Sequence, residues 1–376
     1  MLTLGNIFIF VTKLQPMTTE HKIFTSDART LTKIDNETVD LIVTSPPYPM
    51  IEMWDEIFFL QNEDIKKHFA EGEYELSFEE MHKELDKVWR ECFRVLKTGG
   101  FACINIGDAT RTLSGNFRLF SNHSRILTSC ISTGFQNLPN IIWRKQTNAP
   151  NKFMGSGMLP AGAYVTLEHE FILVLRKGIK REFKTVDEKE KRHQAAYFWE
   201  ERNIWFSDLW DLKGTKQLLQ DEASRKRSAA YPYMLPYRLI NMYSTFDDVV
   251  LDPFLGTGTT MLAAIGARRN SIGVEIDKGF NEIIKKFIQG SENYLNDITQ
   301  DRINNHLEFV KSRNQIKGED VFKYKNENYG FPVMTQQEKN LIIPVVDEIS
   351  LNGNTFKASY KDSTDQLNFR KGSLFA

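Results

Sequence analysis

A glycine-containing loop and an acidic residue about 20 positions after it are the residues best suited to hold a ligand. The loop, Asp252–Thr260 (DPFLGTGTT), follows the apolar run Val249–Leu251. Its two glycines allow a tight turn close to a ligand, and the helix expected after it offers N–H groups and a positive dipole end. Glu275, in the segment GVEID, can accept hydrogen bonds from both ribose hydroxyls of an adenosyl ligand.

Two other nucleotide-binding patterns do not match this loop. A dinucleotide fingerprint needs a third glycine near the first turn of the helix, where this chain has Thr260 and Met261. A phosphate-binding P-loop needs Gly-Lys-Ser/Thr, which this loop does not contain. The predicted ligand is therefore adenosyl without a polyphosphate. The alternative is a plain tight turn followed by a surface glutamate.

The second motif, Thr44–Tyr48 (TSPPY), ends the apolar run Val39–Val43. Two consecutive prolines hold the backbone extended and remove two N–H donors. Carbonyl oxygens and the Ser45 hydroxyl can then point at one spot as acceptors, and Tyr48 can supply a flat aromatic face. This combination suits an exocyclic amino group on a planar ring, although the motif alone would also fit a turn that ends a strand.

Apolar runs and helical spacings predict the elements that position these motifs. Buried parallel strands are predicted at Val39–Val43, Phe101–Ile106, Val249–Leu251 and Ser271–Glu275. Helices are predicted at residues 78–96, 258–267 and 278–289. This alternation predicts an α/β fold with a doubly wound, mostly parallel sheet. Residues 144–230 break the pattern and indicate a loop-rich insertion, and one or two strands are expected around Leu341–Val346.

Composition sets the broad class of protein. With 376 residues, the chain has room for two to three domains of about 150 residues each. A net charge of −1, with 41% hydrophobic and 26% charged residues, indicates a globular protein and excludes a disordered tail, a collagen or a disulfide scaffold. Three cysteines without CxxC spacing indicate a reducing, cytoplasmic compartment, and no apolar run approaches the roughly 20 residues that span a bilayer.

The charge is unevenly distributed along the chain. Residues 51–91 hold 13 acidic and 5 basic residues, a net charge of −8, and are expected to form a scaffold helix or an oligomer surface. Residues 140–240 hold 18 basic and 12 acidic residues, a net charge of +6, so the neutral total does not exclude nucleic-acid binding. The alternative for this region is a solvated charged hairpin. Its candidate phosphate contacts are Lys177, Lys180, Arg181, Lys184, Lys191, Arg192, Arg225, Lys226 and Arg227.

Together the two motifs resemble the amino-methylating DNA methyltransferases that use S-adenosylmethionine. Their order, with TSPPY before DPFLGTGTT, resembles the β class of that family, and the resemblance covers residues 22–290. One departure is Arg227–Ala230, where the family often has His-Pro-Ala-Pro. Further matching segments are Phe24–Ala28, Trp143–Lys145, Glu168–Leu173, Ile204–Trp210 and Tyr231–Ile240.

The resemblance implies a circularly permuted, Rossmann-like methyltransferase fold with S-adenosylmethionine as its cofactor. It implies that Asp27 contacts the adenine amino group, with a surface turn as the alternative. The implied cofactor-binding residues are Asp27, Tyr231, Pro232, Asp252, Pro253, Phe254, Gly256, Gly258, Thr259, Thr260, Glu275 and Asp277. The implied segments are an N-terminal extension (1–21), a catalytic half (22–143), a target-recognition insertion (144–230), a cofactor-binding half (231–295) and a C-terminal extension (296–376).

The same resemblance narrows the reaction. Methylation at cytosine C5 needs a cysteine that in that family follows a proline, and none of the three cysteines here does. Cytosine N4 and adenine N6 remain as targets. The expected catalytic residues are Ser45, Pro46, Pro47 and Tyr48: Ser45 and the Pro46 carbonyl would accept the amino hydrogens, and Tyr48 would stack on a flipped base. Serine before Pro-Pro-Tyr resembles the N4-cytosine subgroup, and N6-adenine is the alternative.

The expected partner is double-stranded DNA, bound by a monomer or homodimer in the cytoplasm. A cognate restriction endonuclease is a second, functional partner, because site-specific methylation would protect host DNA from it. No cluster of metal ligands is found in the sequence, and His169 is expected to be a structural strand residue. Two other classes stay open: a methyltransferase that acts on RNA or on a protein amide, and a DNA-binding module without activity.

Overall fold

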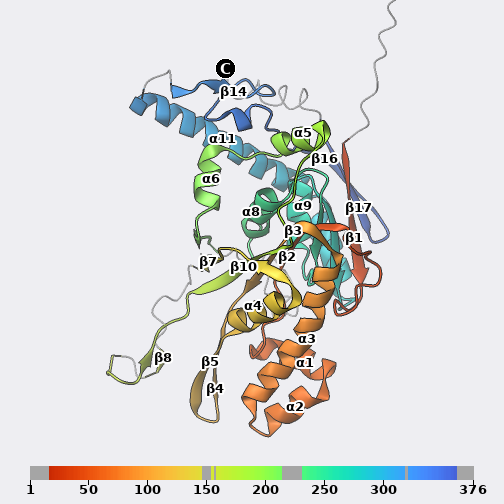
Figure 1. The fold of residues 1–376 in the computed structure, drawn as a ribbon, viewed down its shortest axis with the longest axis vertical. Helices are drawn as coiled ribbons and strands as arrows, with labels where there is room; N and C mark the ends of the chain where they lie inside the picture. Colours follow the sequence, from red (N-terminus) through yellow and green to blue (C-terminus); the bar gives the residue numbers. More distant parts are fainter. Residues whose placement is uncertain (1–16, 146–153, 156–157, 214–230, 318–320, 362–376) are drawn as a thin grey trace, which may run out of the picture.

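The computed structural model describes residues 17–145, 154–155, 158–213, 231–317 and 321–361. Its main feature is an 11-stranded sheet (Figure 1). Five neighbouring strands form its parallel centre. In spatial order they are β1 (Thr18–Thr25), β13 (Asn270–Glu275), β12 (Val249–Asp252), β2 (Val39–Thr44) and β3 (Leu96–Ile106). The four strands predicted from the sequence are all among them.

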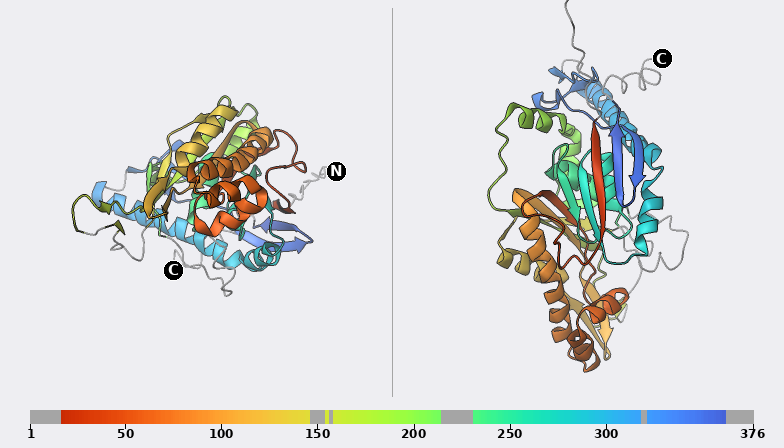
Figure 2. Two further views of the ribbon diagram at one scale, coloured as in Figure 1. Left: turned by 90° about the horizontal axis from the view of Figure 1, so that it is seen from below. Right: turned by 90° about the vertical axis from the view of Figure 1, so that its right-hand side faces the viewer.

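Helices cover both faces of the sheet, as the doubly wound prediction requires (Figure 2). In β2, Leu41 and Val43 pack with α8 (Met234–Tyr243) and α9 (Thr259–Gly266), whereas Ile42 between them packs with α3 (Tyr74–Val95) and α4 (Asn122–Thr133). This alternation follows from the two-residue period of a strand that is buried on both faces. The three predicted helices are confirmed as α3, α9 and α10 (Phe280–Ile288).

The acidic segment after the second motif is helical, as expected. It forms a short 3-10 turn, η1 (Glu52–Trp54), then α1 (Asp55–Gln61), α2 (Glu63–Ala70) and most of α3. Ile65, Met81 and Trp89 of these helices are buried in the cluster that covers one face of the sheet. The apolar side of the segment therefore packs into the core, and most of its carboxylates lie on the outer side, apart from the buried Asp55 and Glu84.

Part of the range 144–230 belongs to the main sheet, which corrects the expectation of a loop-rich insertion. β10 (His169–Lys177) lies antiparallel to β3, and β11 (Leu209–Asp211) lies parallel to β7 (Ile141–Arg144). Residues Ile172–Leu175 of β10 are buried, so this run needs neighbours on both sides. Between these strands lie α5 (Val186–Gln194) and α6 (Trp199–Trp205).

The ends of the chain extend the opposite edge of the sheet. Residues 18–21 belong to β1 and not to an extension, and β17 (Thr355–Tyr360) pairs antiparallel with β1 and with β16 (Val346–Asn352). These strands begin where the expected strand around Leu341–Val346 ends. In the described part of the chain, no helix is both long and apolar enough to cross a membrane.

A long C-terminal helix, α11 (Glu292–Lys317), holds α6 in place. The buried Arg302 donates from Nε to Glu201 at 2.6 Å, and His306 Nδ1 lies 2.7 Å from Glu200. Both glutamates belong to the first turn of α6. The C-terminal segment thus braces residues that the sequence assigned to the recognition insertion.

One strand histidine makes the stability of the fold depend on pH. His21 in β1 is fully buried, with its ring nitrogens 2.8 Å from the hydroxyls of Thr19 and Ser271, and burial lowers its pKa from 6.5 to about 3. The unfolded chain therefore binds a proton below pH 6.5 that the folded chain does not bind until about pH 3, so stability falls as the pH drops through this window. At pH 5 the loss is about 2 kcal/mol.

We expect His21→Gln to remove this part of the pH dependence. Between pH 7 and pH 5, the free energy of unfolding from urea titrations should fall by about 2 kcal/mol less in the variant than in the unchanged protein. Equal losses in both proteins would contradict the assignment of the buried neutral histidine.

Candidate active site

The two motifs lie side by side at the carboxyl edge of the sheet, because β2 and β12 are parallel neighbours. Asp252, at the end of β12, joins them. Its carboxylate is buried and accepts hydrogen bonds from the Thr44 hydroxyl at 2.7 Å, the Thr260 hydroxyl at 2.5 Å and the Phe254 N–H at 3.0 Å. Burial raises the pKa of Asp252, whereas these donors stabilise its charged form. This one carboxylate therefore fixes the glycine loop, the start of α9 and the residue before Ser45.

Tyr231 completes this cluster from the segment before α8. Its hydroxyl lies 3.4 Å from Asp252 Oδ2 and contacts the Thr260 hydroxyl, and both Tyr231 and Pro232 are buried. Phe254 packs edge-on against Trp89 of α3, with ring centroids 6.2 Å apart. Most of the predicted cofactor residues are thus brought together around the loop.

The glycine loop has the conformation that its sequence predicts. Gly256 and Gly258 have φ values of 54° and 92°, in the left-handed region that glycine adopts most readily. Gly258 directly precedes α9, which begins at Thr259. The unpaired N–H groups at the start of this helix face the carboxyl edge of the sheet. At Gly273 in β13, a Cβ atom would lie 2.4 Å from the Leu255 side chain. Glycine there lets the loop pack directly on the neighbouring strand.

Glu275 is held beside this loop, at the end of β13. Its two carboxylate oxygens accept the N–H groups of Gly256 and Asp277, both at 2.9 Å. Burial raises its pKa, and the two hydrogen bonds oppose that shift. A half-buried carboxylate next to the glycine turn is placed to accept hydrogen bonds from the hydroxyls of a ribose. Asp277 accepts the Gly279 N–H at 2.8 Å before α10.

Asp27 follows β1, whose last residue, Thr25, is in register with Glu275. Its carboxylate accepts hydrogen bonds from the Arg29 N–H at 2.8 Å and from Arg29 Nε at 2.9 Å. Burial raises the pKa of Asp27, but the hydrogen bonds from Arg29 outweigh this, and the net shift is downward. The residue lies two positions after the strand that pairs with the Glu275 strand, and its contact with adenine stays a prediction.

The catalytic motif is part of a polar network that the sequence analysis did not predict. Tyr48 donates its hydroxyl proton to Glu170 Oε2 at 2.9 Å and accepts from Asn105 Nδ2 at 2.9 Å. Asn105 Nδ2 also donates to Glu170 at 2.6 Å, and the Lys145 ammonium contacts the other oxygen of Glu170. Burial and the Glu170 charge raise the pKa of Tyr48, which keeps its phenol protonated.

This network sets the direction of the hydrogen bond at Ser45. The Ser45 and Tyr48 hydroxyls lie 3.1 Å apart, and either could donate by distance alone. Because Tyr48 gives its one proton to Glu170, Ser45 must donate to the Tyr48 oxygen. The lone pairs of Ser45 are then free to accept hydrogens from an incoming amino group.

Three of these residues could have been noticed in the sequence. Asn105 and Glu170 lie in buried strands, where a polar side chain needs a partner, and Lys145 is the last residue of Trp143–Lys145, a segment that matches the resembled family. Thr44 belongs to the TSPPY motif, but no role was predicted for it. None of these signals identifies the partner, because the contacts join three strands that are far apart in the chain.

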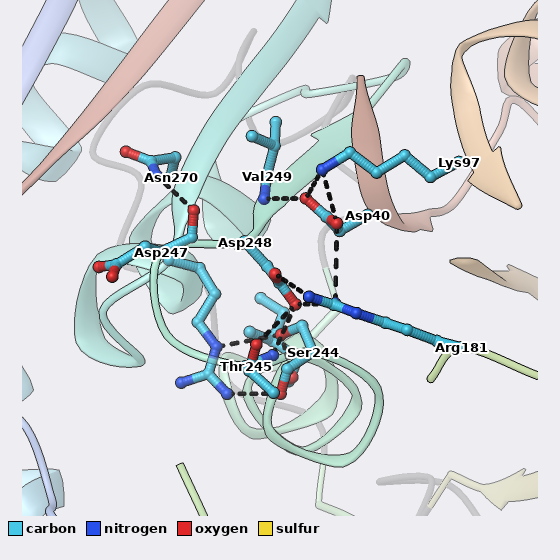
Figure 3. A network of polar contacts seen from close by, with 11 residues as sticks. Asp40, Lys97, Arg181, Ser244, Thr245, Asp247, Asp248, Val249 and Asn270 are labelled. Carbon is cyan, nitrogen blue, oxygen red and sulfur yellow. Dashed lines mark hydrogen bonds and ion pairs between the residues drawn. The ribbon is translucent and has the colours of Figure 1, made fainter. Parts of the chain in front are cut away.

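Those predicted phosphate contacts that the structure describes lie at the opposite, amino edge of the sheet. β10 runs antiparallel to β3, so Lys177, at its end, returns to the start of β3, and its ammonium donates to the Phe93 and Leu96 carbonyls at 2.8 Å. Arg181 donates to both oxygens of Asp248, at 2.7 and 3.1 Å, and faces Asp40 (Figure 3).

This placement corrects the expectation for two residues: the charges of Lys177 and Arg181 are paired inside the protein. Lys191 also pairs, with Asp247 at 2.9 Å. Lys180 and Lys184 are exposed at the same edge. A groove of about 940 Å³ lies there and includes Asp40, Lys97 and Arg181 in its lining, so it is distinct from the catalytic motif. Arg225, Lys226 and Arg227 lie outside the described residues.

The fold and the site define an α/β protein in which a glycine loop held by Glu275 lies beside the Thr44–Tyr48 motif. Residues 39–286 match the model of the DNA methylase family. The chain is 50% identical over 327 residues to the type II methyltransferase M.MthZI of Methanothermobacter thermautotrophicus, covering 86% of this chain and 90% of that protein. It is 51% identical over 283 residues to the type II methyltransferase M.MjaI of Methanocaldococcus jannaschii, covering 72% and 92%.

A solved structure agrees with this result. A protein of Thermus thermophilus described as a putative DNA modification methylase, in complex with S-adenosyl-L-methionine, is 31% identical, with a TM-score of 0.54 over 71% of this chain and 94% of that one. The chain belongs to the DNA methylase family. Membership confirms the α/β methyltransferase fold and S-adenosylmethionine as the cofactor.

Proposed function

We propose that this protein transfers the methyl group of S-adenosylmethionine to the exocyclic N4 of a flipped cytosine in double-stranded DNA. The observation that carries the proposal is the Ser45 hydroxyl, whose proton is directed to Tyr48 and whose lone pairs face away from that bond. The names of M.MthZI and M.MjaI as type II methyltransferases support a role in site-specific modification that protects DNA from a cognate restriction endonuclease.

The chain's own residues account for the activation of a poor nucleophile. The lone pair of an aromatic amino group is delocalised into the ring. Ser45 and the Pro46 carbonyl accept the two amino hydrogens and draw electron density onto nitrogen as the new bond forms. The Tyr48 ring holds the flipped base by stacking. Bound S-adenosylmethionine supplies an electrophilic methyl group on a sulfonium sulfur.

Cofactor binding is assigned to the residues around the glycine loop. Glu275 accepts the ribose hydroxyls, Asp27 contacts the adenine amino group, and the N–H groups at the start of α9 face the cofactor's carboxylate end. The buried Asp252 positions the loop. Of the phosphate contacts predicted for DNA, Arg225, Lys226 and Arg227 remain candidates, whereas Lys180 and Lys184 lie at the edge of the sheet opposite the catalytic motif.

Nucleoside analysis tests the proposed target. The protein is expressed in a bacterial host that lacks other DNA methyltransferases, and the genomic DNA is digested and analysed by mass spectrometry. We expect N4-methylcytosine, and sequencing of the same DNA gives the recognition site. A Ser45→Ala sample serves as the control. N6-methyladenine without N4-methylcytosine would replace cytosine by adenine as the target, and absence of both would reject the proposal.

A further inference from the structure

Two β-hairpins leave the sheet beside the catalytic motif. The first joins β4 (Ala109–Leu113) to β5 (Asn116–Phe120), and it starts directly after β3 ends. The second joins β8 (Met154–Gly155) to β9 (Ala163–Tyr164). Figure 1 shows both hairpins projecting away from the body of the molecule, and the rings of Phe117 and Tyr164 stack with centroids 4.4 Å apart.

The first hairpin has two unlike faces. Arg111 and Arg118 are cross-strand partners on one face. Arg111 donates to both oxygens of Asp55 at 3.0 and 2.7 Å, and Arg118 contacts Glu75. The helices that carry the net negative charge therefore neutralise both arginines, and this face packs against the protein.

The other face is uncharged and partly apolar. It carries Phe117 and Leu119, and Leu119 is 53% exposed. Directly after β9, Val165 is 93% exposed, and it follows Tyr164, whose ring stacks on Phe117. Exposed apolar side chains on a projecting element lose contact with water only when a partner covers them.

The position of these side chains indicates what the partner is. Gly107, two residues before β4, lies against Tyr48: a Cβ atom there would be 3.0 Å from Tyr48 Cε2. The hairpins therefore begin where the target base has to enter. Extrusion of a base breaks its stacking with the neighbours, and proteins stabilise such unstacked steps by inserting apolar side chains.

We propose that the exposed apolar side chains of the two hairpins, Leu119 and Val165, insert into duplex DNA beside the flipped base. The proposal rests on the proposed function, since a duplex with a flipped base is its occupant. Arg111 and Arg118 are paired with carboxylates of the protein, so they are not available to bind phosphates. The hairpins are therefore better suited to contact bases than phosphates. A second copy of this chain is the other occupant that an apolar face could take.

The test compares two double variants. The first, called the wedge variant, carries Leu119→Ser and Val165→Ser, and the matched control carries Ile179→Ser and Val186→Ser. The control side chains are 73% and 77% exposed and lie beyond the end of β10 at the amino edge. Each protein methylates an oligonucleotide duplex that carries the site found by sequencing. In one duplex the target base is paired, and in the other it faces an abasic position, which removes its pairing partner.

We expect the wedge variant to lose about 10-fold in kcat/KM on the paired duplex and less than 3-fold on the abasic duplex, because extrusion of a base costs less free energy when the base has no pairing partner. The control variant should lose nothing on either. Equal losses on both duplexes, or no loss, would overturn the proposal. A wild-type dimer that becomes a monomer in the wedge variant would assign the face to a second copy. Failure of the wild-type protein on both duplexes would reject the proposed function instead.

Discussion

Ser45→Ala is expected to lower the rate of methyl transfer by about 10²- to 10³-fold, the size typical for loss of one hydrogen bond that strengthens in a transition state. Alanine removes the acceptor that the Tyr48–Glu170 network leaves free. It should not change the folded structure, because the hydroxyl bonds only to Tyr48 among the described residues, and Tyr48 keeps Glu170 and Asn105 as partners. Single-turnover methylation of the duplex site measures the rate.

The affinity for S-adenosylmethionine separates this role from a loss of structure. Calorimetry should give the same dissociation constant for Ser45→Ala and the unchanged protein, since the loop around Gly256 and Glu275 is held by its own hydrogen bonds. Ser132→Ala, on the outer side of α4, provides the control. A Ser45→Ala rate within 3-fold of the unchanged protein would contradict the proposed role.

The centre of the fold was predictable because its signals are local. The apolar runs of β2, β12 and β13 each end in a motif or turn, and a strand buried on both faces is recognisable from its own residues. The position of β10 was not predictable in this way. Its apolar run Phe171–Leu175 is just as clear, but its pairing with β3 and β7 joins segments distant in the chain, and only the complete sheet determines it.

The same distinction applies to the site. Ser45 and Tyr48 stand three residues apart, so a short motif contains both. Glu170 is 122 residues from Tyr48, and no spacing in the sequence relates them. Charge counts failed for a related reason: a net charge of +6 over residues 140–240 does not tell which cations have partners elsewhere. Arg181 pairs with Asp248, which lies outside that range. The charge of Arg181 is therefore not available to bind DNA.

Glu170→Gln is expected to lower kcat by about 10- to 100-fold, equivalent to the 1.5–3 kcal/mol typical of hydrogen bonds to a charged group. The glutamate accepts from Tyr48 and Asn105 on one oxygen and from Lys145 on the other. A glutamine has one acceptor oxygen, so its amino group must face a donor on one of these sides. The Tyr48 proton then loses its fixed partner, and Tyr48 can donate to Ser45 and occupy the lone pair that the substrate needs.

A double-mutant cycle distinguishes this indirect role from a general structural one. If Glu170 acts through Tyr48 and Ser45, Glu170→Gln in the Ser45→Ala background should reduce kcat by less than 3-fold, and the KM for DNA should change little in either background. Glu168→Gln, two residues earlier, is the matched control and should leave kcat unchanged. Equal reductions in both backgrounds would contradict the relay, because Glu170 would then affect the reaction by a route that does not include the Ser45 hydroxyl.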